Sequence, residues 1–205
     1  MKSVSFLSLL VFLILPTALQ AQVANHVVIS EFATRGAAAN AAGEFVEIYN
    51  PTNQAVNISG WALQYQSASG SSYNPLATVP EGTAMPPKSY FLFTSPTWSG
   101  TPAGDVAWSG SGLADNGNLR IVNASGVPVD RVGFGSGNNP EGSVAPNHGT
   151  SGNDNSVERK ASTTSTAASL AAGGAEEFAG NGWDSDNNAA DFVEQTGGRH
   201  PQNSA

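Results

Sequence analysis

Short apolar and aromatic runs alternate with clusters of glycine, proline, asparagine and serine from His26 to about Gly135. This rhythm is typical of an all-β sandwich, and no helical period is sustained over the segment. We therefore predict strands at 27–33, 44–50, 56–66, 88–94, 118–123 and 128–134, with a shorter strand near 105–109.

The predicted strand 44–50 carries apolar side chains on both faces. A period of two places Val46 and Ile48 on one face and Phe45, Glu47 and Tyr49 on the other. We expect one face to meet the core and the other to be partly covered.

The predicted strand 56–66 follows a turn at Asn50-Pro51-Thr52-Asn53. Gly60 within it gives room for a bulge or for a close backbone neighbour. We predict that Trp61 belongs to the core.

Composition changes after Gly135 to glycine, asparagine, serine, threonine and alanine, which can bury little apolar surface. The run 156–160 indicates an edge strand. The low-complexity segment 162–174 indicates a flexible loop, in which residues 167–172 could form one helical turn. Apolar residues near the end of the chain predict that this part folds back onto the sandwich: Phe178, Trp183, Phe192 and Val193. The predicted organisation is a leader over 1–21, a sandwich core over 22–135 and a loop-rich extension over 136–205.

The first 21 residues have the pattern of a secretory signal. Lys2 precedes the apolar stretch from Val4 to Leu15, and the segment ends in small residues at Ala21. The apolar run is too short for an ordinary transmembrane helix, and no second run follows it. We predict cleavage after Ala21 and a protein secreted or held in the cell envelope, without a membrane span once the signal is removed.

Charge and cysteine content narrow the function further. The formal net charge of −8 would repel a phosphate backbone, so no nucleic-acid partner is expected. The chain has no cysteine, so its core forms without disulfides and no lipid-modified N-terminal cysteine can anchor it.

Several segments together resemble the lamin tail domain family, an immunoglobulin-like β-sandwich. The resemblance is carried by the first strand at 27–32, by 43–64 with Gly60-Trp61, by 86–93, and by 105–108 followed by the hairpin 118–132. The segments 156–160, 184–192 and 201–203 are similar to the C-terminal part of bacterial exported members. The resemblance implies a non-enzymatic module for protein interaction or surface display, and it implies no ligand residues.

Glu31 and Glu47 are the candidate carboxylate pair of a hydrolase. They lie within strands expected to be neighbours, so they could share a proton or bind a cation. The alternative is an ordinary ion pair with Arg120, Arg131 or Arg159. We favour this alternative and predict no catalytic residues.

Asp184, Asp186 and Asp191 form the candidate metal site. Oxygen side chains recur there closely enough to bind calcium, although the run departs from the EF-hand pattern at Ala189 and Gln195. Aspartate and asparagine also hydrogen-bond their own backbone in turns, which requires no metal. No other cofactor is predicted.

Trp98 raises a carbohydrate-binding alternative, because exposed aromatic faces stack on sugars and this residue lies in a loop between Pro96 and Gly100. The competing interpretation is a packed loop anchor. The histidines His26, His148 and His200 lack the spacing of metal ligands. We therefore expect a binding module whose partner is a protein or a cell-surface glycan.

Overall fold

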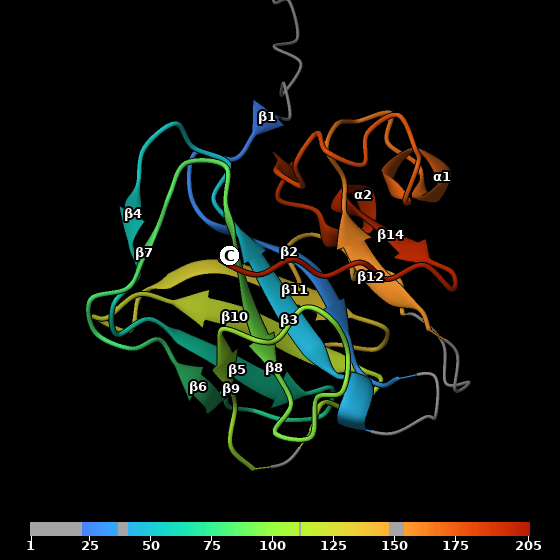
Figure 1. Ribbon diagram of the computed structural model, residues 1–205. Coiled ribbons are helices and arrows are strands. Elements are labelled where there is room, and N and C mark those ends of the chain that lie inside the picture. Colours follow the sequence, from blue (N-terminus) through green and yellow to red (C-terminus); the bar gives the residue numbers. More distant parts are fainter. Residues whose placement is uncertain (1–21, 37–40, 111, 148–153) are drawn as a thin grey trace, which may run out of the picture.

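The computed structural model describes residues 22–36, 41–110, 112–147 and 154–205. The predicted signal segment 1–21 lies outside the described residues. Two β-sheets pack against each other as an immunoglobulin-like sandwich (Figure 1). The predicted all-β class is therefore confirmed.

The smaller sheet of the sandwich has the order β11 (Pro128–Phe134), β10 (Gly117–Val122), β5 (Ala62–Ser67) and β6 (Asn74–Thr78). The larger sheet has the order β14 (Phe192–Gln195), β12 (Ser156–Arg159), β2 (Val28–Ala33), β3 (Phe45–Tyr49), β8 (Tyr90–Thr94) and β9 (Val106–Ala107). Neighbouring strands run antiparallel, except β8 and β9, which are parallel.

Short elements lie at the margins of the sandwich. β1 (Gln22–Val23) pairs with β13 (Trp183–Asp184), and β4 (Val56–Asn57) pairs with β7 (Ala84–Met85). The helical pieces are η1 (Ala41–Gly43), α1 (Ala167–Leu170) and α2 (Asn188–Asp191). The predicted helical turn is α1, which begins with a capping box formed by Thr166 and Ser169. None of the described helices has both the length and the apolar character needed to cross a bilayer.

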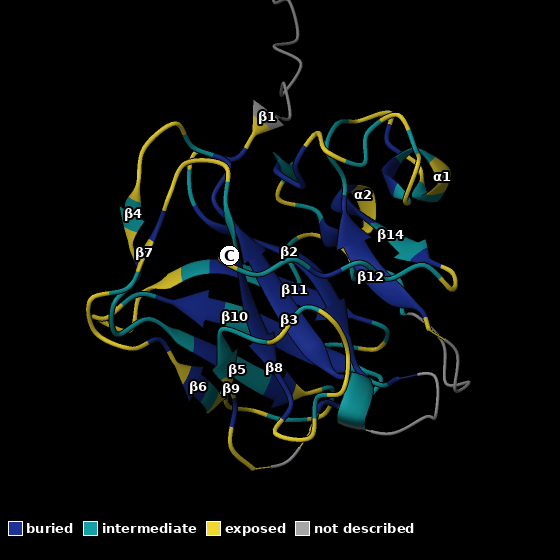
Figure 2. Ribbon diagram, viewed as in Figure 1, coloured by how far each residue is buried: buried dark blue, intermediate teal, exposed yellow. Residues whose placement is uncertain are grey.

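The main core lies between the two sheets. Val46 and Ile48 of β3 face it, as the period of two predicts, together with Phe32 from β2 and Phe134 from β11. The two phenylalanine rings lie 4.8 Å apart between centroids. Figure 2 shows that β2, β3 and β12 are buried along their length, which means that the outer face of the larger sheet is covered as well.

The predicted single strand 56–66 is wrong, because a tight turn divides it into β4 and β5. Gly60 has a φ of +71°, and the Trp61 N–H donates to the Ile58 carbonyl at 3.0 Å. A positive φ is readily available to glycine and rotates the chain out of the strand direction. The turn leaves Trp61 at the margin of the sandwich, half-buried, so the prediction of a core position for it is also wrong.

Residues 156–160 do not form an edge strand. β12 lies between β14 and β2, and each of its four residues is buried. The C-terminal part of the chain thus adds two strands to the larger sheet. The fold-back prediction holds for Phe192, which is in the core, but Phe178 is 90 % exposed and does not pack on the sandwich core.

Candidate functional site

A row of three glutamates crosses the outer face of the larger sheet. Glu31 on β2 lies directly opposite Glu47 on β3 and opposite Glu158 on β12. The sequence predicts Glu31 and Glu47 on neighbouring strands. The observed register places the two residues directly opposite each other. Glu158 completes the row because its strand is internal.

Two small apolar clusters flank this row on the same face. Ala33, Phe45 and Leu92 form one cluster, against which Trp98 packs. Ala24, Val28 and Tyr49 form the other, against which Tyr90 packs. The outer face therefore carries a polar band between two apolar ends, which explains why β3 has apolar side chains on both faces.

The segment 199–205, which we call the tail, lies across this face (Figure 1, dark red, ending at the C-terminal label). The backbone N–H of His200 hydrogen-bonds to Glu31, and that of Gln202 donates to Glu47 Oε2 at 2.6 Å. The Ser204 N–H donates to Asp105 Oδ2 at 3.0 Å. The tail thus binds the glutamate row through its backbone.

Burial favours the protonated form of the glutamates. Burial and the neighbouring Glu158 carboxyl group together raise the pKa of Glu31 to about 8. Burial, together with Glu31, holds the pKa of Glu47 well above its ordinary value. Burial also raises the pKa of Glu158, although the Gln195 amide that hydrogen-bonds to it acts in the opposite direction. Carboxyl groups so close together cannot all ionise in a desolvated site.

Serine hydroxyls complete the hydrogen bonding of the pair. The Ser30 hydroxyl donates to Glu47, and the Ser156 hydroxyl donates to Glu31. Glu31 is 2 % exposed and Glu47 is 1 % exposed. A substrate could reach these carboxyl groups only after the tail had moved.

The predicted ion pairs of Glu31 and Glu47 with three arginines are wrong. Arg120 donates to Gln64 at 2.7 Å, and Arg131 lies 3.8 Å from Glu141. Arg159 points to the opposite face of the sheet and binds Asp130 at 2.9 Å. Alternation along β12 accounts for this, because adjacent residues of a strand point to opposite faces.

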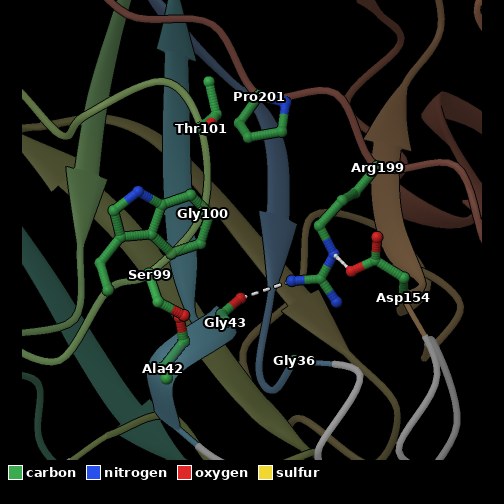
Figure 3. A pocket seen from close by; sticks show the side chains of 10 residues that line it. Gly36, Ala42, Gly43, Ser99, Gly100, Thr101, Asp154, Arg199 and Pro201 are labelled. Carbon is green, nitrogen blue, oxygen red and sulfur yellow. Dashed lines mark hydrogen bonds and ion pairs between the residues drawn. The ribbon is translucent and has the colours of Figure 1, made fainter.

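Arg199, at the start of the tail, lies in a cavity of about 380 Å³ on one side of the glutamate row (Figure 3). Its Nε atom lies 2.5 Å from Asp154 Oδ1, and its Nη2 atom donates to the carbonyls of Arg35 and Asn155 at 2.8 and 3.0 Å. Nη1 donates to the Gly43 carbonyl at 2.5 Å. The guanidinium therefore fixes the tail at this end.

Trp98 lines the same cavity, and its partly buried ring packs against the outer-face cluster of Phe45 and Leu92. It makes an edge contact with Phe45 at 5.7 Å between centroids, and its indole N–H donates to the Pro102 carbonyl at 2.9 Å. Gly100 lies against the ring, and a Cβ atom added there would come within 2.3 Å of it. These contacts favour the interpretation of Trp98 as a loop anchor.

The three candidate calcium ligands lie around a turn, in different environments. Asp191 is fully buried and accepts hydrogen bonds from the Ser185 and Asn187 N–H groups at 3.1 and 3.3 Å. Asp184 Oδ1 lies 3.5 Å from Arg159 Nη1, whereas Asp186 is exposed. Within the described ranges, no three acidic, histidine or cysteine side chains form a group that could hold a metal ion.

Arg159 provides the positive charge for these aspartates. The guanidinium is completely buried, and its Nη1 atom lies 4.0 Å from Asp191 Oδ2. It also lies over the Phe192 ring, 4.5 Å from the centroid. The Asp186 N–H donates to Asp184 Oδ1 at 3.3 Å, as expected of a turn that closes on its own side chains.

The two histidines in the described part of the chain have different surroundings. His26 Nε2 is 3.6 Å from Asp184 Oδ2, and His200 takes part in the tail through its backbone. His148 lies outside the described residues.

Sequence reasoning missed Glu158, Arg199 and the aromatic pair formed by Tyr49 and Tyr90. The two tyrosine rings lie 4.6 Å apart between centroids, near the other end of the tail. The only sequence signal for such a cluster is the apolar bulk on the second face of β3.

These features define a β-sandwich whose larger sheet is covered on its outer face by its own C-terminal segment. A sequence model of the Lamin Tail Domain family matches residues 20–136, more than half of the chain. The chain therefore belongs to the lamin tail domain family. A comparison with curated proteins finds no significant match. β12, β14 and the tail lie beyond the matched residues.

Proposed function

We propose that this protein is an exported lamin-tail module that binds a partner at the cell envelope or outside the cell and has no catalytic role. Family membership supports a non-enzymatic β-sandwich module. The pattern of the first 21 residues supports export.

The observation that carries the binding role is the contrast between the closed carboxylate pair and an exposed aromatic side chain beside a cavity. Glu31 and Glu47 are buried beneath the tail, where they hydrogen-bond to serine hydroxyls and backbone N–H groups. Near the other end of the tail, Phe178 is exposed beside a cavity that Tyr49 and Tyr90 line. An exposed aromatic ring beside a cavity is suited to binding.

Export is tested by expressing the full chain in its own cell and fractionating the culture. We expect the protein outside the cytoplasm, with an intact mass that corresponds to removal of residues 1–21. The matched control replaces Leu9 and Leu10 by arginine, which interrupts the apolar run. Unprocessed wild-type protein in the cytoplasm would contradict the proposal.

Partner binding is tested by cosedimentation of the purified mature protein with isolated envelopes. We expect saturable binding, and treatment of the envelopes with protease would then distinguish a protein partner from a glycan partner. Absence of saturable binding to the envelope and to proteins of the culture medium would contradict the binding role.

The two alternatives have their own tests. A hydrolase that uses Glu31 and Glu47 would turn over glycosidase, esterase or nuclease substrates and lose this activity in Glu47→Gln; such a result would contradict a function in binding alone. Sugar recognition through Trp98 has one observation in its favour, since this residue lines a cavity with Arg199 and Asp154. No glycan-array signal with the folded protein would remove it.

A further inference from the structure

A second cavity of about 380 Å³ lies on the side of the glutamate row away from Trp98. Three separate parts of the chain form it: strand ends of the larger sheet, the loop that precedes β13, and the tail. Its lining residues are Tyr49, Lys88, Tyr90, Phe178, Ala179, Gly180 and Gln202. The volume falls near the lower end of the range of about 300–1,000 Å³ that is usual for small-molecule sites.

The aromatic wall of this cavity is built in a fixed geometry. The Tyr49 and Tyr90 rings are inclined by 31° and lie 4.6 Å apart between centroids. Gly180 approaches Tyr49 so closely that an added Cβ would lie 2.4 Å from the hydroxyl oxygen, and its φ is +82°. Glycine is therefore required here for the loop to reach the tyrosine pair.

The loop that carries Phe178 is anchored to the sheet by Asn181. The Asn181 amide donates to Glu158 Oε1 at 2.9 Å and to the Arg159 carbonyl at 2.8 Å. The Tyr90 hydroxyl donates to Asn181 Oδ1 at 3.3 Å. These contacts hold the loop beside the cavity while Phe178 remains 90 % exposed.

Single exposed apolar side chains are common on protein surfaces, so Phe178 alone would indicate nothing. The cavity beside it supplies the second observation, because it combines aromatic rings with a lysine and an amide side chain. Lys88 donates to the Pro51 carbonyl and Gln202 hydrogen-bonds to Tyr90, and each side chain has further donors that a polar ligand can use.

We propose that this cavity binds a neutral carbohydrate, with the exposed Phe178 ring against the apolar face of a pyranose ring and with Lys88 and Gln202 bound to its hydroxyl groups. A pyranose has an apolar face and a polar edge, which matches an aromatic wall with polar groups at its margin. The inference rests on the proposed binding function and specifies its ligand.

Charge favours a neutral ligand over an acidic one. Lys88 contributes the only cation to the lining of this cavity within the described chain, and its ammonium group already donates to the Pro51 carbonyl. The formal net charge of the whole chain is −8, which repels polyanions at a distance. Burial raises the pKa of Tyr90, so its hydroxyl keeps its proton at neutral pH.

The test is titration calorimetry of the purified mature protein with cellohexaose, chitohexaose and an oligogalacturonate as probes. We expect binding of at least one neutral oligosaccharide and weakening of about tenfold in Phe178→Ser, through loss of one stacking ring. The matched control is Val127→Ser, which removes another exposed apolar side chain, 54 % accessible, from the hairpin between β10 and β11. Circular dichroism should show that both variants fold, since neither side chain is in the core.

Three results would overturn the proposal: no binding of either neutral probe at millimolar concentration, equal affinity of wild type and Phe178→Ser, or binding of the oligogalacturonate alone. Binding to protease-treated envelopes that Phe178→Ser weakens would support an envelope glycan as the source of the sugar; binding to the free oligosaccharides alone would support a soluble one. Envelope binding without any sugar binding would contradict this inference but agree with the proposed function. Absence of all partner binding would contradict the proposed function itself.

Discussion

Individual residues in this protein contribute to stability according to how the turns place them. Phe32 is completely buried and contacts the Phe134 and Phe192 rings between the sheets. Trp61 is larger, but the turn at Gly60 leaves it half-buried at the margin. The larger side chain is therefore not the more important one.

We predict that Phe32→Ala lowers the free energy of unfolding by about 3–5 kcal/mol, through lost apolar burial and the cavity left behind. Trp61→Ala should lower it by no more than about 2 kcal/mol, because less of its surface leaves water on folding. Urea denaturation of both variants measures the difference. Equal effects would show that Trp61 is a full core residue after all.

The glutamate row makes the stability depend on pH. The folded-state pKa of Glu31 is about 8, against an ordinary value of 4.5, so the folded state holds its proton over a pH range in which the unfolded state has lost it. This contribution to stability is fully present below about pH 4.5 and is lost as the pH rises through about 8.

We therefore predict that wild-type protein loses a few kcal/mol of unfolding free energy between about pH 5 and about pH 9, and that Glu31→Gln loses less, because its amide does not titrate. Urea melts over this range measure both slopes. The control is Glu177→Gln, whose carboxylate accepts a hydrogen bond from the Gly173 N–H of its own loop at 2.8 Å. A steeper slope for Glu31→Gln than for wild type would refute the assignment.

At the scale of the elements, the turn between β13 and α2 shows how one buried cation organises several acids. Arg159 lies within 4.0 Å of Asp130, Asp184 and Asp191, and it also donates to the Ile29 carbonyl at 2.8 Å. The guanidinium joins β12 to β2, β11 and the turn. The residues 184–191 therefore need not bind a metal to balance their charge.

Calcium binding at Asp184, Asp186 and Asp191 stays a prediction, and the melting temperature tests it. If calcium binds the folded state, millimolar calcium raises the melting temperature of wild type in a concentration-dependent way and leaves Asp186→Ala unchanged. Identical melts of wild type in calcium and in chelator would assign the turn to its side-chain hydrogen bonds and to Arg159 alone.

At the scale of the whole molecule, the segment that follows the family-matched residues completes the sandwich. β12 pairs with the edge of β2, and Phe192 from β14 enters the main core. The tail then covers the outer face of the sheet that these strands extend. The part beyond residue 136 is thus a structural part of the same sheet.

We predict that a fragment of residues 22–136 fails to fold cooperatively. It would lose β12, β14 and Arg159, expose the edge of β2 and leave Asp130 without its buried partner. Circular dichroism and urea denaturation of the fragment, with the chain 22–205 as control, check this. A fragment with a sharp transition like that of the control would show that the matched region is independently stable.

The sequence by itself determined the β-sandwich class, most of the central strands and the division of β3 into two faces. These properties are local, because a period of two and the punctuation by glycine, proline and asparagine follow from the conformations of single residues and their neighbours. The family resemblance added the immunoglobulin-like type of the sandwich.

Only the tertiary structure decided which neighbours these elements have. The register of β2 with β3 and β12 makes three distant glutamates into one row, and strand order turns a predicted edge strand into an internal one. Arg159 donates to the Ile29 carbonyl, and Gln202 of the tail donates to Glu47, across more than 100 residues of the chain in each case. Such pairings arise from the burial of the sheet faces as a whole, which no local pattern of residues specifies.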